Sequence, residues 1–481
     1  MRPEQETELR AKLISGAKWA TVVRFASQAF SWVITLIMVR LLTPADYGLN
    51  AMIEVPIELL MLFSTLGMDA AIIRFGKRDA EQLASTFGLL LLLNMLFFLI
   101  LLLSAGMIAS YFKEPRLTAL IQVTALIFVL TPFRVIPNAL LDMDLDFKLK
   151  SQVELAASVI SALVALLLAL AGAGVWALVA AILLNTVLRA GPLMYLRPWI
   201  LRPALRIAPV RELLNYGVVI MAGGAIGVIS AKALSLLAGP HLGVEVLGFY
   251  AVASVFSMLP MSKVMPILQQ TMFPAFAQLK DQPAMARKYL LKSLELAALI
   301  IFPLTIGMAC VSGHLVTVVF GDKWRAISLP LTILAALGPL RLVNQIFHGP
   351  LNAIGHAKSV TTINFISLAV LSGGALYAAS HGLMGLIYLT GLSVLIATSV
   401  SVTIGGKVFG TTPQDLIKSV TPALTASLAM AAALVTSKYL IADQSGLIRL
   451  LLEVAGGGCI YLLVIRLFFS VKFDEIKNHI K

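Results

Sequence analysis

The chain has 481 residues, of which 59% are hydrophobic and only 13% are charged. A soluble protein carries about 25% charged residues on its surface, so this composition excludes a water-soluble domain and indicates that lipid surrounds much of the chain. The net charge of +13 does not indicate nucleic acid here, because the basic residues lie in short loops between apolar runs, where they set membrane orientation and contact anionic headgroups.

Apolar stretches long enough to cross roughly 30 Å of hydrocarbon as helices recur to the end of the chain. The predicted spans are 15–39, 47–72, 83–110, 117–141, 152–172, 174–196, 213–238, 247–272, 290–313, 328–352, 360–380, 382–404, 415–437 and 446–469. They predict an all-α integral membrane protein with about 14 transmembrane helices. Most Lys and Arg residues fall in alternate loops, so the positive-inside rule places both termini in the cytoplasm.

The two halves of the chain resemble each other at an offset of about two hundred residues. Gly48 of an Asp-Tyr-Gly turn matches Gly248 of Leu-Gly-Phe-Tyr, and Pro-Phe-Arg134 matches Pro-Leu-Arg341. Each repeat holds six spans, an even number, so a pseudo-two-fold axis along the membrane normal should relate the halves. The predicted parts are an N-terminal six-helix lobe at 1–196, a cytoplasmic interfacial linker at 197–212, a C-terminal six-helix lobe at 213–404, and two additional helices with a cytoplasmic tail at 405–481.

Charged side chains within the spans are the first candidates for a functional site, because each costs several kcal/mol at bilayer depth unless it meets a partner or a wet cavity. Guanidinium and ammonium groups suit an anionic headgroup, and amide side chains suit sugar hydroxyls. The predicted substrate-binding residues are Arg24, Arg134, Lys232, Lys263, Arg341, Asn344, Gln269 and Gln270. The alternative for the cations is that they form structural ion pairs or reach to the interface.

Two acidic residues share one face of the second predicted span. Glu54 and Glu58 are spaced i, i+4, with Pro56 between them to weaken or kink the helix. By helical rise, Arg24 in the first span reaches a similar depth to Glu58, so these two residues could meet near the midplane. The pair is either a proton or cation site for ion coupling, or simply an ion-pair partner for Arg24.

Motifs for covalent or metal chemistry are not found in the sequence. It contains no Gly-x-x-x-x-Gly-Lys-Ser/Thr phosphate loop, and Cys310 and Cys459 have no metal-ligand spacing. His314, His348 and His381 lie near span ends, where we expect them at the interface rather than as ligands. We therefore expect no catalytic residue, no metal, no enzymatic activity and no cofactor, apart from possible coupling to H⁺ or Na⁺.

Three segments near the start of the chain resemble the polysaccharide-transporter family of Wzx-type flippases, within the multidrug/oligosaccharidyl-lipid/polysaccharide exporter superfamily. They are an opening Gly-Ala-Lys-Trp19, the turn Arg-Leu-Leu-Thr-Pro-Ala-Asp-Tyr-Gly48 and the run Leu-Phe-Ser-Thr-Leu-Gly-Met-Asp-Ala-Ala71. The repeat layout extends the resemblance, more loosely, over the whole chain. The Glu54 and Glu58 pair departs from the family, in which this position is mostly apolar.

The resemblance implies a flippase of the bacterial inner membrane that serves lipopolysaccharide or exopolysaccharide biosynthesis. Its substrate is then an oligosaccharide repeat unit on a polyprenyl pyrophosphate, moved from the cytoplasmic to the periplasmic leaflet by alternating access through a cationic cavity. The last two helices would form a groove for the polyprenyl tail, and the partners would be membrane lipids and the polysaccharide polymerase and export machinery. The alternatives are an ion-coupled antiporter for small drugs or metabolites, a membrane-embedded polymerase or ligase, and a structural scaffold.

Overall fold

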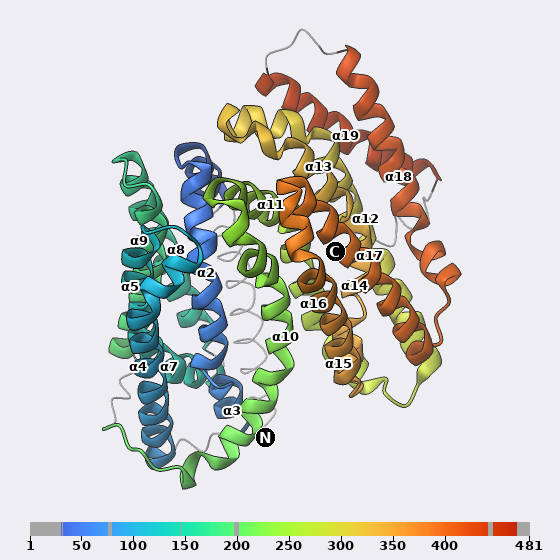
Figure 1. The fold of residues 1–481 in the computed structure, drawn as a ribbon. Helices are drawn as coiled ribbons and strands as arrows, with labels where there is room; N and C mark the ends of the chain where they lie inside the picture. The colour runs from blue at the N-terminus through green and yellow to red at the C-terminus, as the bar shows by residue number, and fades with distance from the viewer. Residues whose placement is uncertain are drawn as a thin grey trace. The chain divides into compact units, whose positions relative to one another are not determined.

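The computed structural model describes residue 30 and residues 32–75, 79–144, 146–196, 202–440 and 446–468. Within these ranges the chain is almost wholly helical and contains no strand (Figure 1). The chain divides into two compact units, each with most of its spatial contacts inside itself: Met1–Leu236 (unit 1) and Leu237–Lys481 (unit 2). The predicted all-α membrane fold is confirmed, whereas the four predicted domain ranges stay a prediction.

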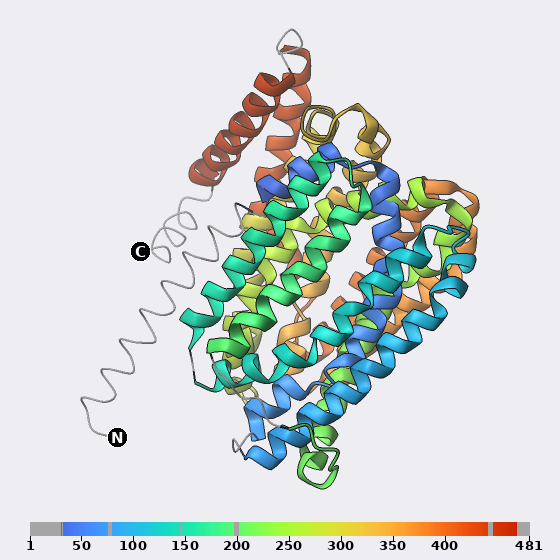
Figure 2. The same cartoon turned by 90° about the vertical axis from the view of Figure 1, so that its left-hand side faces the viewer.

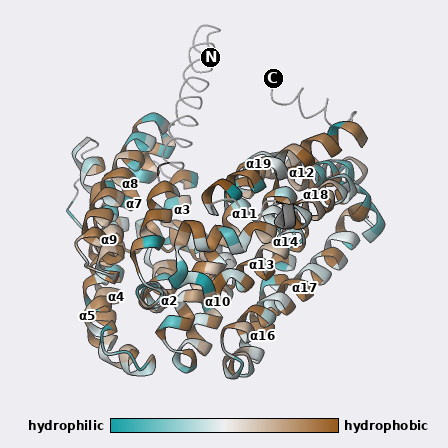
Figure 3. Ribbon diagram, turned by 90° about the horizontal axis from the view of Figure 1, so that it is seen from above, coloured by the Kyte–Doolittle hydropathy of each residue, from teal (hydrophilic) through white to brown (hydrophobic). Residues whose placement is uncertain are grey.

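Eleven helices are long and apolar enough to cross a membrane, and two further pairs of helices pass the same test as bent spans, which gives up to 13. Hydrophobic residues, brown in Figure 3, cover much of these helices. Each of them overlaps one predicted span after the first. The predicted span 15–39 lies mostly outside the described residues, which show only its end as the short apolar helix Trp32–Leu41.

Unit 1 begins, within the described residues, with that short helix and continues through nine α-helices. These are α2 (Pro44–Ser64), α3 (Met68–Phe75), α4 (Ala80–Tyr111), α5 (Leu117–Thr124), α6 (Leu126–Leu130), α7 (Pro132–Met143), α8 (Phe147–Leu170), α9 (Val175–Leu196) and α10 (Arg211–Leu242), the last of which extends past the unit boundary. A 3₁₀ turn, η1 (Ala208–Val210), precedes α10. The neighbours α8 and α9 form a helical hairpin (Figure 2).

Unit 2 has the same alternation of long and broken helices. Its elements are α11 (Val244–Gln278), α12 (Pro283–Leu315), η2 (Val316–Phe320), η3 (Asp322–Ile327), α13 (Ser328–Ala336), α14 (Gly338–Gln345), α15 (His348–Ala353), α16 (Ala357–Ser380), α17 (Gly382–Phe409), α18 (Pro413–Leu440) and α19 (Gly446–Phe468). The last two helices both pack on α12, and Tyr461 of α19 donates a hydrogen bond to the Leu299 carbonyl of α12 at 2.8 Å. The largest hydrophobic core cluster of the described residues is centred on α12.

The turn that carries the family resemblance has a structural role in unit 1. Thr43 caps α2, because its hydroxyl accepts a hydrogen bond from the Asp46 N–H while the Asp46 carboxylate accepts one from the Thr43 N–H. The other Asp46 oxygen accepts a hydrogen bond from the Val175 N–H at 2.9 Å. Gly174 lies beside this carboxylate with a φ of +56°, a conformation that favours glycine. The turn therefore joins the start of α2 to the α8–α9 hairpin.

Both units contain a bent span at matching positions in the sequence. The break at Thr131 turns α7 by 42° from α5 and α6, and the break at Leu337 turns α14 by 41° from α13. A proline lies at the first or second position of each following helix, where its fixed φ suits a helix start. Arg134 and Arg341 lie in the first turn after each break. The repeat seen in the sequence is therefore present in the helices as well.

Candidate functional site

Two carboxylates and one lysine meet between α2 and α10 in unit 1. The Lys232 Nζ lies 2.8 Å from Glu54 Oε2 and 2.9 Å from Glu58 Oε1. The Lys232 side chain is 16% exposed, whereas those of Glu54 and Glu58 are 37% and 46% exposed. The amide of Asn50, one turn before Glu54, donates a hydrogen bond to Glu54 Oε1 at 2.7 Å. We call Lys232, Glu54 and Glu58 the charge triad.

The charge triad joins residues that the sequence placed in two separate groups. Lys232 was predicted to bind substrate, and the glutamates to couple an ion or to pair with Arg24. Arg24 lies outside the described residues, so its predicted meeting with Glu58 stays a prediction. A lone lysine in one apolar helix and two acids at i, i+4 in another are complementary in sequence, but no local pattern shows which distant helices face each other.

The arginine of unit 2 is deeply buried. Arg341 is 8% exposed, and its Nη1 donates a hydrogen bond to the Ser257 hydroxyl of α11 at 3.2 Å. Within the described part of the chain, no carboxylate lies within ion-pair distance of its guanidinium. A buried charge without a counter-ion is costly, so the position of Arg341 favours a role with an anionic ligand.

The short helix that carries Arg341 is fixed to α17 by two polar contacts. The Thr398 hydroxyl donates to the Leu340 carbonyl at 3.1 Å, and the Ser401 hydroxyl donates to the side-chain carbonyl of Asn344. Asn344 was predicted to contact sugar hydroxyls, but in this structure its side-chain oxygen bonds Ser401. These contacts hold α14 in place after the bend and so position the guanidinium.

Arg134 has a more open setting at the matching place in unit 1. It is half-buried, and the charges that act on it are those of Arg189, Asp69 and Glu154. Arg189 lies 3.9 Å from Glu154, so that pair is loose. Among the residues described, the Arg134 guanidinium makes no hydrogen bond or close ion pair, although its backbone N–H donates to the Thr131 carbonyl at 3.1 Å. Both arginines that follow the bends thus have no carboxylate of a described residue in direct contact.

The remaining predicted polar residues lie on α11, the helix that also supplies Ser257. Lys263 and Gln269 are partly buried and Gln270 is exposed. Lys263 and Gln270 are seven residues apart and therefore share one face of the helix. Three internal prolines interrupt the hydrogen bonding of this helix at positions 260, 266 and 274.

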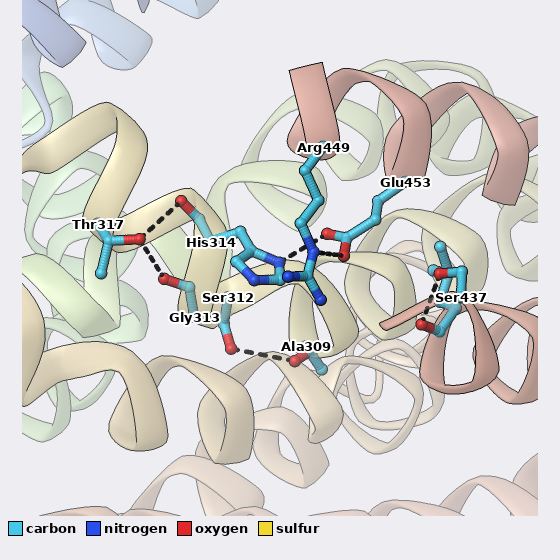
Figure 4. Close-up of polar contacts among 9 residues, drawn as sticks. Ala309, Ser312, Gly313, His314, Thr317, Ser437, Arg449 and Glu453 are labelled. Carbon is cyan, nitrogen blue, oxygen red and sulfur yellow. Dashed lines mark hydrogen bonds and ion pairs between the residues drawn. The ribbon is translucent and has the colours of Figure 1, made fainter. Parts of the chain in front are cut away.

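A further cluster of ionisable side chains, which the sequence did not predict, lies in unit 2 around a buried glutamate (Figure 4). Glu453 of α19 is 1% exposed at its side chain, and its Oε2 lies 2.9 Å from His314 Nδ1 of α12. The Nε of Arg449, one turn before Glu453, lies 3.3 Å from Glu453 Oε1. His314 was expected at the interface on its own. The i, i+4 spacing of Arg449 and Glu453 could have indicated an ion pair on one helix face. It could not indicate that His314 of a distant helix contacts the same glutamate.

The fold is similar to that of two solved helical membrane proteins. The chain superposes on the structure of the lipid II flippase MurJ in an inward closed conformation with a TM-score of 0.73 and 13% identity, over 94% of this chain and 100% of that chain. It superposes on an inward-facing multidrug resistance MATE family transporter of the MOP superfamily with a TM-score of 0.62 and 16% identity, over 81% and 98% of the two chains. The fold and its long apolar helices therefore define a polytopic helical membrane protein.

The chain belongs to the family described as "Polysaccharide biosynthesis protein", which matches residues 37–329. It is 28% identical to the lipopolysaccharide biosynthesis protein WzxC of Escherichia coli (strain K12) over 74% of this chain and 72% of that protein. It is 24% identical to the teichuronic acid biosynthesis protein TuaB of Bacillus subtilis (strain 168) over 76% of each. The succinoglycan biosynthesis transport protein ExoT of Rhizobium meliloti (strain 1021) is 21% identical over 76% of this chain and 74% of that protein. The predicted family is confirmed.

Proposed function

We propose that this protein is a flippase that moves a polyprenyl-pyrophosphate-linked oligosaccharide repeat unit from the cytoplasmic to the periplasmic leaflet by alternating access. The observation that carries the proposal is Arg341, a buried guanidinium in the first turn after a helix break and without a carboxylate in contact in the described residues. Guanidinium binds phosphate oxygens in pairs. The names of the relatives support the substrate class, since one is a biosynthesis transport protein and another a lipopolysaccharide biosynthesis protein.

The proposed transport also specifies where the protein resides, what drives it and which proteins act next. The protein resides in the bacterial inner membrane with both termini in the cytoplasm, and it carries its substrate without chemical change. An ion gradient of H⁺ or Na⁺, or the membrane potential acting on bound charge, drives the movement. The polysaccharide polymerase and export machinery take over the product, and no nucleic acid is involved.

The test reconstitutes the purified protein in liposomes that contain a fluorescent polyprenyl-pyrophosphate oligosaccharide and follows transfer between leaflets. We expect protein-dependent transfer that falls by about tenfold or more in Arg341→Gln, because a charge-assisted hydrogen bond contributes about 1.5–3 kcal/mol. Arg341→Lys should recover only part of it, since lysine keeps the charge but not the paired geometry. Arg325 is an exposed arginine of the same unit, so Arg325→Gln is the matched control and should transfer normally.

Two outcomes contradict the proposal. If wild-type protein transfers no lipid under any imposed ion gradient or potential, the chain is not a flippase for this substrate, and export of a small molecule becomes the function to test. If Arg341→Gln transfers as fast as wild type while remaining folded, the guanidinium does not bind the substrate. Folding of every variant is checked by thermal unfolding in detergent.

A further inference from the structure

The charge triad contains one more negative charge than positive. Lys232 neutralises one of the two carboxylates, and Glu54 and Glu58 are the charged groups that act on its ammonium. The described helices that pack on α2 carry their charges elsewhere, such as Glu81 in the first turn of α4 and Arg189 near the Glu154 carboxylate. A surplus negative charge among membrane-spanning helices is costly unless a cation accompanies it.

An oxygen atom beside the triad lacks a hydrogen-bond partner. Asn50 uses its NH₂ group to donate to Glu54, whereas its side-chain carbonyl oxygen is buried and makes no hydrogen bond to any described residue. A buried acceptor without a hydrogen-bond partner is unfavourable. Asn50, Glu54 and Glu58 are spaced i, i+4, i+8 and therefore form one stripe on α2. The stripe combines an orphaned carbonyl oxygen with two carboxylates, and hard cations bind such oxygen ligands.

We propose that Asn50, Glu54 and Glu58 form a binding site for one Na⁺ ion, and that Lys232 is a movable internal cation which shares this site. With Lys232 in place, a single bound Na⁺ balances the surplus charge. When Lys232 leaves for an anionic ligand, two carboxylates one helical turn apart remain, and their mutual repulsion raises the affinity for Na⁺. The ammonium group sits on a flexible four-carbon stem, which permits this exchange.

The exchange links two binding events. A phosphate group that draws Lys232 away strengthens Na⁺ binding, and by thermodynamic reciprocity Na⁺ strengthens the binding of the phosphate group. This linkage, but not the Na⁺ site itself, rests on the proposed transport of a pyrophosphate-linked lipid. It would give the flippase a direct means of coupling its substrate to a sodium gradient.

The experiment measures binding of radioactive ²²Na⁺ to the purified full-length protein in detergent, with K⁺ and choline as competitors and inorganic pyrophosphate as the anionic probe. Wild type should bind Na⁺ saturably, and pyrophosphate should tighten binding by about fivefold or more, the lower end of typical coupling between sites. Asn50→Ala and Glu58→Gln should each weaken Na⁺ binding. Glu212 is an exposed acid on the same helix as Lys232, so Glu212→Gln is the matched control and should bind like wild type.

A second pair of variants tests the lysine. Lys232→Met should bind Na⁺ more tightly than wild type without pyrophosphate and should no longer respond to it. Because this variant leaves two uncompensated carboxylates, its fold could be weakened. The double variant Lys232→Met with Glu54→Gln restores the net charge of the triad, and it should bind Na⁺ without any response to pyrophosphate.

Several results overturn the inference. The Na⁺ site is excluded if the wild type shows no saturable ²²Na⁺ binding, or if Glu58→Gln binds ²²Na⁺ as tightly as wild type. The movable lysine is excluded if pyrophosphate changes ²²Na⁺ binding in both Lys232 variants as it does in wild type. The lipid-transfer assay separates this failure from that of the proposed function. Transfer without Na⁺ binding removes the inference and keeps the flippase, whereas linked Na⁺ and pyrophosphate binding without lipid transfer keeps the inference and removes the flippase.

Discussion

Gly67 lies directly against Gly217, so that the break between α2 and α3 touches the backbone of α10. A Cβ atom on Gly217 would lie 2.1 Å from the Leu66 carbonyl oxygen, and one on Gly67 would lie 2.6 Å from the Gly217 carbonyl oxygen. Neither helix can approach as closely with any larger residue. The helix α10 also carries Lys232, 15 residues after Gly217, and α2 carries Glu54, 13 residues before Gly67.

We predict that Gly217→Ala destabilises the protein by about 1–3 kcal/mol, because the added methyl group meets backbone that cannot rotate away. Thermal unfolding in detergent measures the effect. Gly224 lies on the same helix with nothing within 4 Å of an added Cβ, so Gly224→Ala should leave stability unchanged or raise it through better helix propensity. Equal unfolding temperatures for the two variants would contradict the close crossing.

We predict that Gly88→Ala weakens the contact between the 202–210 segment and α4. The Ala204 N–H donates to the Ala84 carbonyl of α4 at 3.1 Å, and a Cβ on Gly88 would lie 2.2 Å from the Ala204 carbonyl oxygen. Hydrogen exchange of the 202–210 segment should therefore rise in this variant. Gly106 is on the same helix with open space around it, and Gly106→Ala should show wild-type protection.

Asn344 and Ser401 are predicted to act as one unit that holds α14 beside α17. Asn344→Ala and Ser401→Ala should each lower stability by about 1 kcal/mol, because each removes one partner of the same hydrogen bond. The double variant should lose much less than the sum of the two single effects. Ser399 is exposed on the same helix, and Ser399→Ala should have no effect. If Asn344→Ala alone raises the substrate concentration needed for half-maximal transfer, Asn344 contacts the sugar, as the sequence predicted.

His314 is predicted to hold α19 on α12 through Glu453. His314→Ala should lower stability by about 1–3 kcal/mol, because Glu453 is buried and would lose its hydrogen bond with the His314 ring. His356 is exposed, so His356→Ala serves as the control. In a double-mutant cycle with Glu453→Ala, additive losses would show that the two side chains do not interact in the folded protein.

Most of the fold could be predicted from the sequence, because membrane spans are defined by length and hydropathy, which are local properties. The predicted spans after the first match the helices. The matching Pro-x-Arg segments of the repeat fall at the two bends, which the sequence did not predict. The sequence could not predict that Lys232 pairs with Glu54 or that His314 pairs with Glu453. Each pair joins helices more than one hundred residues apart, and a single sequence does not show which faces of apolar helices meet.

The matching bends also bear on how the chain arose. A duplicated ancestral unit would pass on its broken helix together with the cation at its start, and both halves retain these features. The acids were not shared in this way, since Ser254 and Met258 stand in the second half where Glu54 and Glu58 stand in the first. The two halves thus share a broken helix and its arginine but differ here, since the first half carries two acids at positions that are neutral in the second.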